Sequence, residues 1–167
     1  MNNNDRALLE KNRKKQSLKS MYFNRYLLVR YVTALFFFSN LYWLISLVLS
    51  DSILYVIPLV LILFLLASFA EQVKIYSSPT NNARYTKYCF TALLVTNVIC
   101  ILPVCFSSSF AHLYPFLVNQ DKSRILVLTI LIFGLLLAAF ILRRLDKIRH
   151  NDDKHYARIK SYEKVIN

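Results

Sequence analysis

Residues 125–142 read ILVLTILIFGLLLAAFIL, a stretch of 18 residues without any Asp, Glu, Lys or Arg. Three further charge-free runs precede it, over residues 31–50, 52–70 and 88–120. An α-helix rises about 1.5 Å per residue, so about 20 apolar residues cross a hydrocarbon layer of about 30 Å. The runs therefore predict four membrane-spanning helices, at about 26–49, 53–70, 88–106 and 125–142.

The continuous apolar character of these runs excludes the other fold classes. Strands of a membrane barrel alternate apolar and polar residues over about 10 positions, whereas these runs are apolar on every face. An open sheet would leave unpaired backbone groups in lipid. We therefore predict an all-α, polytopic membrane protein with a bundle of four transmembrane helices. Only residues 50–52 separate the first two spans, which predicts an antiparallel hairpin with Asp51 or Ser52 capping the second helix.

The positive charge is distributed unevenly along the chain. The sequence has 21 Lys and Arg against 9 Asp and Glu, a net charge of +12. Of these 21 cations, 19 lie in the N-terminal flank, the loop between spans two and three, or the C-terminal tail. Only Lys122 and Arg124 lie on the other side. The positive-inside rule then predicts that both termini are cytoplasmic.

The chain divides into a basic flank (1–25), a transmembrane domain (26–142) and a basic tail (143–167). The tail has a short heptad-like seam with Asp152 and His155 in its middle. Two heptads are few for a stable coiled coil. The pattern predicts a continuation of the fourth helix that docks on a partner or on the N-terminal flank, or an amphipathic tail that lies on the membrane.

Basic residues next to the spans are candidates for lipid contact. Each Lys or Arg close to an anionic inner leaflet contributes about 1 kcal/mol of attraction. Nucleic-acid binding is not expected, because the chain lacks a folded module or an aromatic stacking platform for it. The candidate lipid-contact residues are Lys11, Arg13, Lys14, Lys15, Lys19, Arg143 and Arg144.

Polar and small residues inside the spans are candidates for helix packing. Asn40 and Asn97 are expected at a similar depth, where a cross-helix hydrogen bond contributes about 0.6 kcal/mol. Gly134 and Ala138 form a small-xxx-small face that lets another helix approach closely, either span two or another protein. Packing is the favoured role for these residues, and a solute pathway is the alternative.

Several local features carry further expectations. Pro58 and Pro103 remove backbone donors and are expected to kink or unwind their helices. Glu71 lies at a span end and is expected to be a solvated boundary residue. The segment 107–124 fits an interfacial helix or a tilted extension of span three.

The sequence contains no recognisable catalytic, cofactor or metal site. Gly134 is the only glycine, so no phosphate-binding or dinucleotide-binding loop can be built. The three cysteines form no C-x-x-C pair, and the HNDDKH run over 150–155 is a weak metal signal. We therefore expect no enzymatic activity.

The sequence has no recognisable catalytic site, but it has features that suit binding to another protein: the basic flank, the tail seam and the small-residue face. We expect a non-catalytic accessory, regulatory or immunity-type subunit of a larger membrane assembly, with a membrane-protein partner or self-association. The alternative is a subunit of an oligomeric transporter or channel, which predicts that Asn40, Thr96, Asn97 and Thr129 converge on one wet cavity. A membrane enzyme is a third hypothesis without an assembled site. The composition, rich in Asn, Lys, Ile and Tyr, is typical of an AT-rich, bacterial genome and indicates a bacterial cell membrane.

Overall fold

The computed structural model describes residues 3–104 and 106–166, and these residues form helices without any β-strand. Four of the helices are long and apolar enough to cross a membrane, which confirms the prediction of an all-α protein with four spans. The elements are α1 (Asn3–Asn24), α2 (Leu27–Leu49), the 3₁₀ turn η1 (Ile53–Tyr55), α3 (Val56–Ser77), α4 (Arg84–Val104), α5 (Ser107–Leu113), α6 (Asp121–Arg149) and α7 (Lys154–Ile166).

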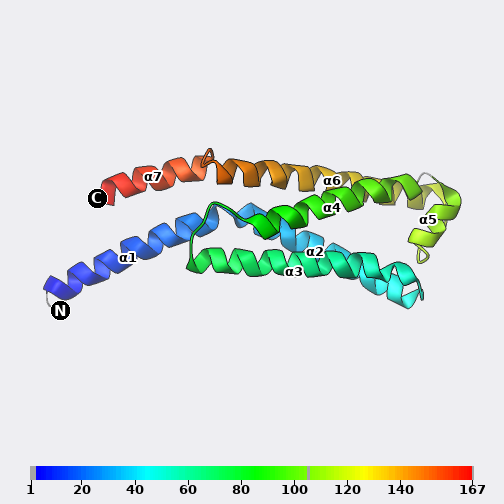
Figure 1. The fold of residues 1–167 in the computed structure, drawn as a ribbon, viewed down its shortest axis with the longest axis horizontal. Coiled ribbons are helices and arrows are strands. Elements are labelled where there is room, and N and C mark those ends of the chain that lie inside the picture. The colour runs from blue at the N-terminus through cyan, green and yellow to red at the C-terminus, as the bar shows by residue number, and fades with distance from the viewer. Residues whose placement is uncertain (1–2, 105, 167) are drawn as a thin grey trace.

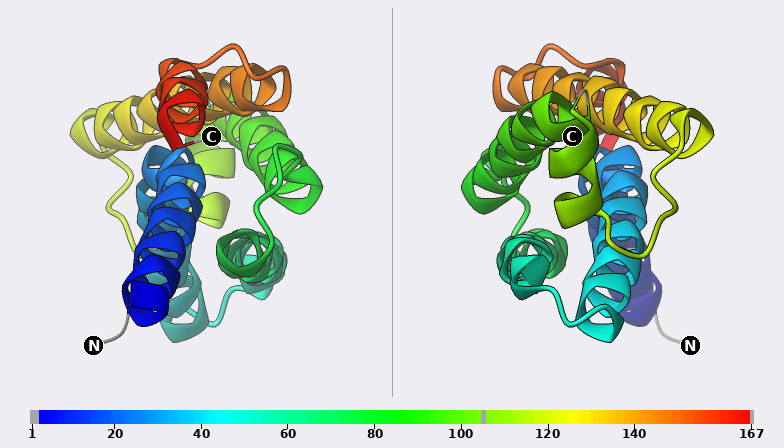
Figure 2. Two further views of the ribbon diagram at one scale, coloured as in Figure 1. Left: turned by 90° about the vertical axis from the view of Figure 1, so that its left-hand side faces the viewer. Right: turned by 90° about the vertical axis from the view of Figure 1, so that its right-hand side faces the viewer.

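The four long helices run side by side along the length of the molecule (Figure 1). Viewed along that length, α2, α3, α4 and α6 lie around a common centre (Figure 2). Helices α1 and α7 project together from one end, so both termini lie at that end, and α5 crosses the opposite end (Figure 1). The pairs α4–α6, α2–α3 and α3–α4 pack most extensively, whereas α2 and α6 scarcely touch.

The outer surface of the bundle is apolar. Leu49 and Ile53 are 80% and 81% exposed, and large aliphatic and aromatic side chains point outward from every long helix. A water-soluble protein of this size rarely exposes such continuous apolar area. The outward faces are therefore suited to hydrocarbon, and the buried residues form two cores inside.

The helices extend beyond the charge-free runs. Helix α3 continues to Ser77, α4 begins at Arg84 and α6 continues to Arg149. At the other end of α4 the helix stops at Val104, two residues before the predicted limit of 106. Charge-free runs mark only the part of a helix inside hydrocarbon, and a helix can continue into the headgroup region where charged side chains are solvated.

Local chemistry sets the connections between the spans. Ser52 caps the start of the second span by accepting a hydrogen bond from the Leu54 amide, while Asp51 adopts a positive φ of 51°. Pro58 lies in the first turn of α3, where its missing N–H removes no intrahelical bond. Pro103 lies in the last turn of α4. Both prolines therefore stand near helix ends and not in the middle of a span.

The segment 107–124 consists of the short helix α5, a loop over 114–120 and the first turn of α6, and it does not extend span three. Phe110, Leu113 and Tyr114 are buried against Val104 of α4 and Val127 of α6. The segment thus covers the bundle end opposite the termini.

The C-terminal tail is not continuous with the fourth span. Helix α6 ends at Arg149, Asn151 adopts a positive φ of 58°, and α7 begins at Lys154. After this break α7 packs on α1, and the Tyr22 hydroxyl donates to Glu163 over 3.3 Å. Of the sequence-based alternatives, the structure shows docking on the N-terminal flank.

The small-residue face of α6 packs within the chain, and its partner is α4. A Cβ built on Gly134 would lie 3.2 Å from Nδ2 of Asn97, and Ala138 is fully buried. The sequence analysis gave span two as the packing partner of this face within the chain. The structure shows that the partner is span three.

We expect Gly134→Leu to destabilise the bundle by about 1–3 kcal/mol, because the larger side chain forces α4 and α6 apart. The measurement is the free energy of unfolding by denaturant in detergent micelles. The matched control is Ile132→Leu, since Ile132 is 45% exposed on the same helix. Equal stability of the two variants would contradict the close α4–α6 contact.

Candidate functional site

An open groove lies between α2, α4 and α6. Its volume is about 630 Å³. It exists because α2 and α6 scarcely touch while both pack on their other neighbours. Its wall is mostly apolar, from Leu35 to Trp43 on α2 and from Leu126 to Leu137 on α6, and the groove is partly open to the surroundings.

Polar groups line this apolar groove. Asn40, Thr96 and Asn97 are all part of its wall. The Asn40 amide donates to the Phe36 carbonyl one turn back over 2.8 Å, and the hydrogen bonds of the described residues do not join it to Asn97. The two asparagines thus line the same groove, as expected for residues at a similar depth. The expected hydrogen bond between these two described residues is not formed.

Trp43 adds a further polar group beside the groove. Its ring stacks on Tyr114 with a centroid distance of 6.0 Å, but its buried Nε1–H has no hydrogen-bond partner among the described residues. A buried donor without an acceptor costs about 1–3 kcal/mol. This donor has almost no exposed surface, so it is buried beside the groove and not open to it.

Thr129 does not belong to the groove. It lies on an exposed face of α6 and donates to its own Ile125 carbonyl over 2.8 Å. The convergence expected of a solute pathway is therefore incomplete, since three of the four residues share the cavity and the fourth does not.

A second polar set links three spans near the end that carries the termini. Gln72 of α3 donates to Thr33 of α2 over 3.1 Å and to Ser68 over 3.0 Å, and Ser68 donates to Thr86 of α4 over 3.1 Å. All four side chains are buried. The Gln72–Thr33 and Ser68–Thr86 bonds act as cross-helix links in a medium that offers no water as a substitute, while the Gln72–Ser68 bond lies within α3.

Glu71 completes this set by capping α4. Its carboxylate accepts from the Tyr85 amide over 3.1 Å and from the amide and hydroxyl of Thr86, each over 2.7 Å. A carboxylate suits a helix N-terminus, because the first backbone N–H groups there have no intrahelical acceptor. The expectation of a merely solvated boundary residue is thus wrong.

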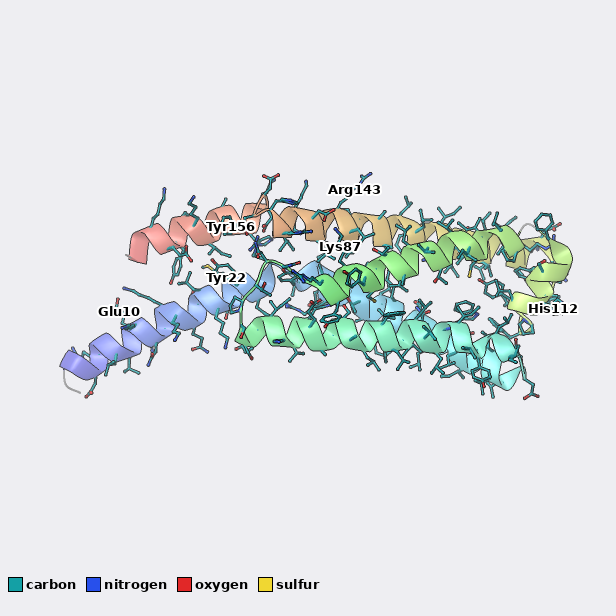
Figure 3. The ribbon with its side chains drawn as sticks, in the orientation of Figure 1. Glu10, Tyr22, Lys87, His112, Arg143 and Tyr156 are labelled. Atoms are coloured by element: carbon teal, nitrogen blue, oxygen red, sulfur yellow. The ribbon has the colours of Figure 1, made fainter. Side chains whose placement is uncertain are left out.

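A buried ion pair joins the two ends of the chain. Arg25, between α1 and α2, pairs with Asp153, between α6 and α7, and both side chains are about fully buried. Arg25 also donates to the Ile148 carbonyl over 3.1 Å and to Asn151 over 3.0 Å, and Tyr156 lies with its ring 5.0 Å from the guanidinium. Figure 3 shows Tyr22 and Tyr156 close to this junction.

The helix breaks on both sides make this pairing geometrically feasible. The chain turns at Arg25 and Tyr26 between α1 and α2, and it turns again at 150–153. The left-handed backbone at Asn151 is a conformation that asparagine tolerates better than most residues. Burial alone would raise the pKa of Asp153, but the hydrogen bonds and charge of Arg25 outweigh it and hold the pKa below its ordinary value of 3.8.

The candidate lipid-contact residues occupy different surroundings. Lys11, Arg13 and Lys15 are exposed on α1. Arg143 is exposed on α6 (Figure 3). The other three have neighbours or are partly covered: Lys14 pairs with Glu10 over 3.0 Å, Lys19 lies 4.7 Å from the Tyr76 ring centroid, and Arg144 is half-buried.

The described residues do not bring three His, Cys, Asp or Glu side chains together as a metal site. His112 lies at the opposite end of the molecule from the junction at Tyr156 (Figure 3). Cys89 and Cys100 are buried free thiols, and Cys105 lies outside the described residues.

Sequence reasoning missed Gln72, Arg25 and Asp153. One signal was present for Gln72, because it follows Ser68 by four residues and so shares a helix face with it. No sequence signal pairs Arg25 with a residue 128 positions away.

We expect Arg25→Met to destabilise the protein by about 3 kcal/mol, because it leaves the Asp153 carboxylate buried without its partner. The double variant Arg25→Met/Asp153→Leu is expected to recover most of the loss. The measurement is the free energy of unfolding in micelles.

The control for this experiment is Lys87→Met. Lys87 pairs with Asp146 over 2.8 Å, but the two side chains are 41% and 50% exposed, so the loss is expected to stay below about 1 kcal/mol. Similar losses for Arg25→Met and Lys87→Met would contradict the special role of the buried pair.

Acidification is expected to separate α7 from α1. A lowered carboxyl pKa contributes stability that is complete above the ordinary value and is lost as the pH falls through the lowered one. The distance between spin labels at Gln16 and Lys160 should therefore lengthen only below pH 3.8. The labels are placed in a background with the cysteines replaced by alanine.

The same titration of Asp153→Asn provides the control. Its label distance should already be long at neutral pH and should stay constant through this range. Separation of the wild-type helices at pH 5–6 would show that another group controls the junction.

Comparison with known proteins gives no relative for this arrangement: no protein-family model, no curated protein and no solved structure matches the chain.

Proposed function

We propose that this chain is a non-catalytic accessory, regulatory or immunity-type subunit that binds a transmembrane helix of a larger membrane assembly. The observation that carries the proposal is the laterally open groove between α2 and α6. It is lined mostly by apolar side chains and also by the polar side chains of Asn40 and Asn97.

The chemistry of the groove favours a protein partner. Acyl chains match the apolar wall but cannot hydrogen-bond to the amide of Asn97, which lines the groove. A helix with a polar side chain such as Ser, Thr or Asn can do both, and such bonds support helix association in membranes. Contact over several turns of α2 and α6 also suits a rod-shaped occupant.

The charge pattern supports an orientation for this subunit. The end that carries both termini also carries most of the Lys and Arg, which favours the cytoplasmic side of a bacterial cell membrane for it. In that orientation α1 and α7 extend into the cytoplasm or along its membrane surface.

Site-specific photocrosslinking in native membranes tests the proposal. A photoreactive phenylalanine analogue replaces Tyr42 or Phe133 at the groove, with the exposed Leu63 and Ile132 as controls outside it. We expect a discrete protein adduct from the groove positions and none from the controls. Ser39→Trp, which fills the groove, should abolish it.

Equal labelling at all four positions, or adducts only with lipid, would contradict helix docking. The alternative function is a subunit of an oligomeric transporter or channel, and the convergence of Asn40, Thr96 and Asn97 on one cavity favours it. Solute flux in proteoliposomes that Asn97→Leu abolishes would support this alternative.

A further inference from the structure

A second cavity lies where the two ends of the chain meet. Its volume is about 440 Å³, and it is bounded by the α1–α2 connection on one side and by α6 and α7 on the other. Its polar wall contains Arg144, His155 and Arg158. Its apolar wall contains Leu27 and Leu28, with Met21 and Ile159 nearby.

Two of the three arginines that border this cavity, Arg144 and Arg158, belong to none of the ion pairs among the described residues. Arg25 also borders the cavity, but it is paired with Asp153. Arg144 interacts electrostatically with Asp153. Its Nε is buried and has no hydrogen-bond partner among the described residues. Arg158 is exposed and belongs to none of the ion pairs among the described residues.

Two guanidinium groups around one hollow indicate an anion of matching geometry. Arginine presents planar, paired N–H donors that suit phosphate and carboxylate oxygens, and such charge-assisted bonds are among the stronger hydrogen bonds of proteins. His155 adds a ring nitrogen to the same wall. A phosphoryl group between the two guanidinium groups would reduce the repulsion between these cations.

The depth of the cavity identifies the source of the phosphoryl group. Arg144 stands two residues beyond the charge-free run that ends at Leu142, and Leu27 opens the helix of the first span. The arginines are therefore at headgroup level, and Leu27 and Leu28 lie where an acyl chain begins. A phospholipid matches this order, because its phosphate lies at the headgroup level and its acyl chains lie deeper in the membrane.

We propose that this cavity is a binding site for the phosphate headgroup of an anionic phospholipid. The lipid belongs to the leaflet at the end that carries α1 and α7. Anionic headgroups are favoured over zwitterionic ones, because a choline ammonium would add a third cation to the two arginines. Basic pockets between transmembrane helices are a recognised mode of lipid headgroup binding.

This site differs from diffuse attraction by the N-terminal flank. The exposed Lys11, Arg13 and Lys15 add attraction at any point of an anionic surface, whereas the cavity holds one headgroup against defined side chains. The proposal is independent of the helix-docking function, since the two cavities share no wall residue.

The test measures lipid retention on the full-length protein by native mass spectrometry. The protein is released from mixed micelles that contain phosphatidylglycerol or phosphatidylcholine with the same acyl chains. The test variant is Arg144→Gln/Arg158→Gln. The matched control is Arg143→Gln/Lys160→Gln, which removes the same charge from exposed residues of the same two helices outside the cavity.

We expect wild-type protein and the control variant to retain one phosphatidylglycerol in preference to phosphatidylcholine. The test variant should lose about tenfold in affinity, as expected for the loss of two charge-assisted contacts. Arg158→Gln alone, at an exposed residue with little effect on folding, should give a smaller loss in the same direction.

Three results would overturn the proposal. One is equal retention of the two lipids by the wild type, and another is an equal loss in the test and control variants, which indicates diffuse attraction. The third is displacement of the lipid by millimolar inorganic phosphate, which would assign the cavity to a soluble phosphate compound instead.

Discussion

The structure depends on the absence of water in the hydrocarbon layer. Each backbone N–H and C=O that crosses this layer needs a partner inside the protein, and only helices and closed barrels provide one for every residue. The four apolar runs therefore become helices whatever their individual propensities. The same condition governs the side chains, because a polar group among the spans gains no hydrogen bond from the surroundings.

Two arrangements of polar side chains follow from this condition. Gln72, Ser68, Thr33 and Thr86 form a chain of hydrogen bonds, of which the Gln72–Thr33 and Ser68–Thr86 bonds each hold two helices together. The groups beside the α2–α6 groove include Trp43, which has a buried donor without a partner among the described residues. The first arrangement holds α2, α3 and α4 together, although the buried Oε1 of Gln72 has no hydrogen-bond partner among the described residues. The polar side chains of the second arrangement line an open groove, which is the reason for proposing a function there.

Charged residues occupy the boundary of the layer, and there they organise the ends of the helices. Glu71 caps α4, and Arg25 with Asp153 holds α7 near the start of α2. This junction places Arg144 and Arg158 around one hollow. The basic residues thus do more than orient the chain in the membrane, since their detailed positions create a site of defined shape.

The apolar character and the length of the charge-free runs were enough to predict the helical class and four candidate spans, because crossing hydrocarbon requires about 20 apolar residues whatever the neighbours are. They also placed Gly134 and Ala138 on a packing face, since small residues permit close approach on any partner. The partner itself, α4, emerged only from the packed helices, as did the break at Asn151 and the pairing of Arg25 with Asp153 across 128 positions. Local patterns depend on neighbours within a few residues, whereas these contacts depend on how whole helices are placed around a shared core, which no single segment specifies.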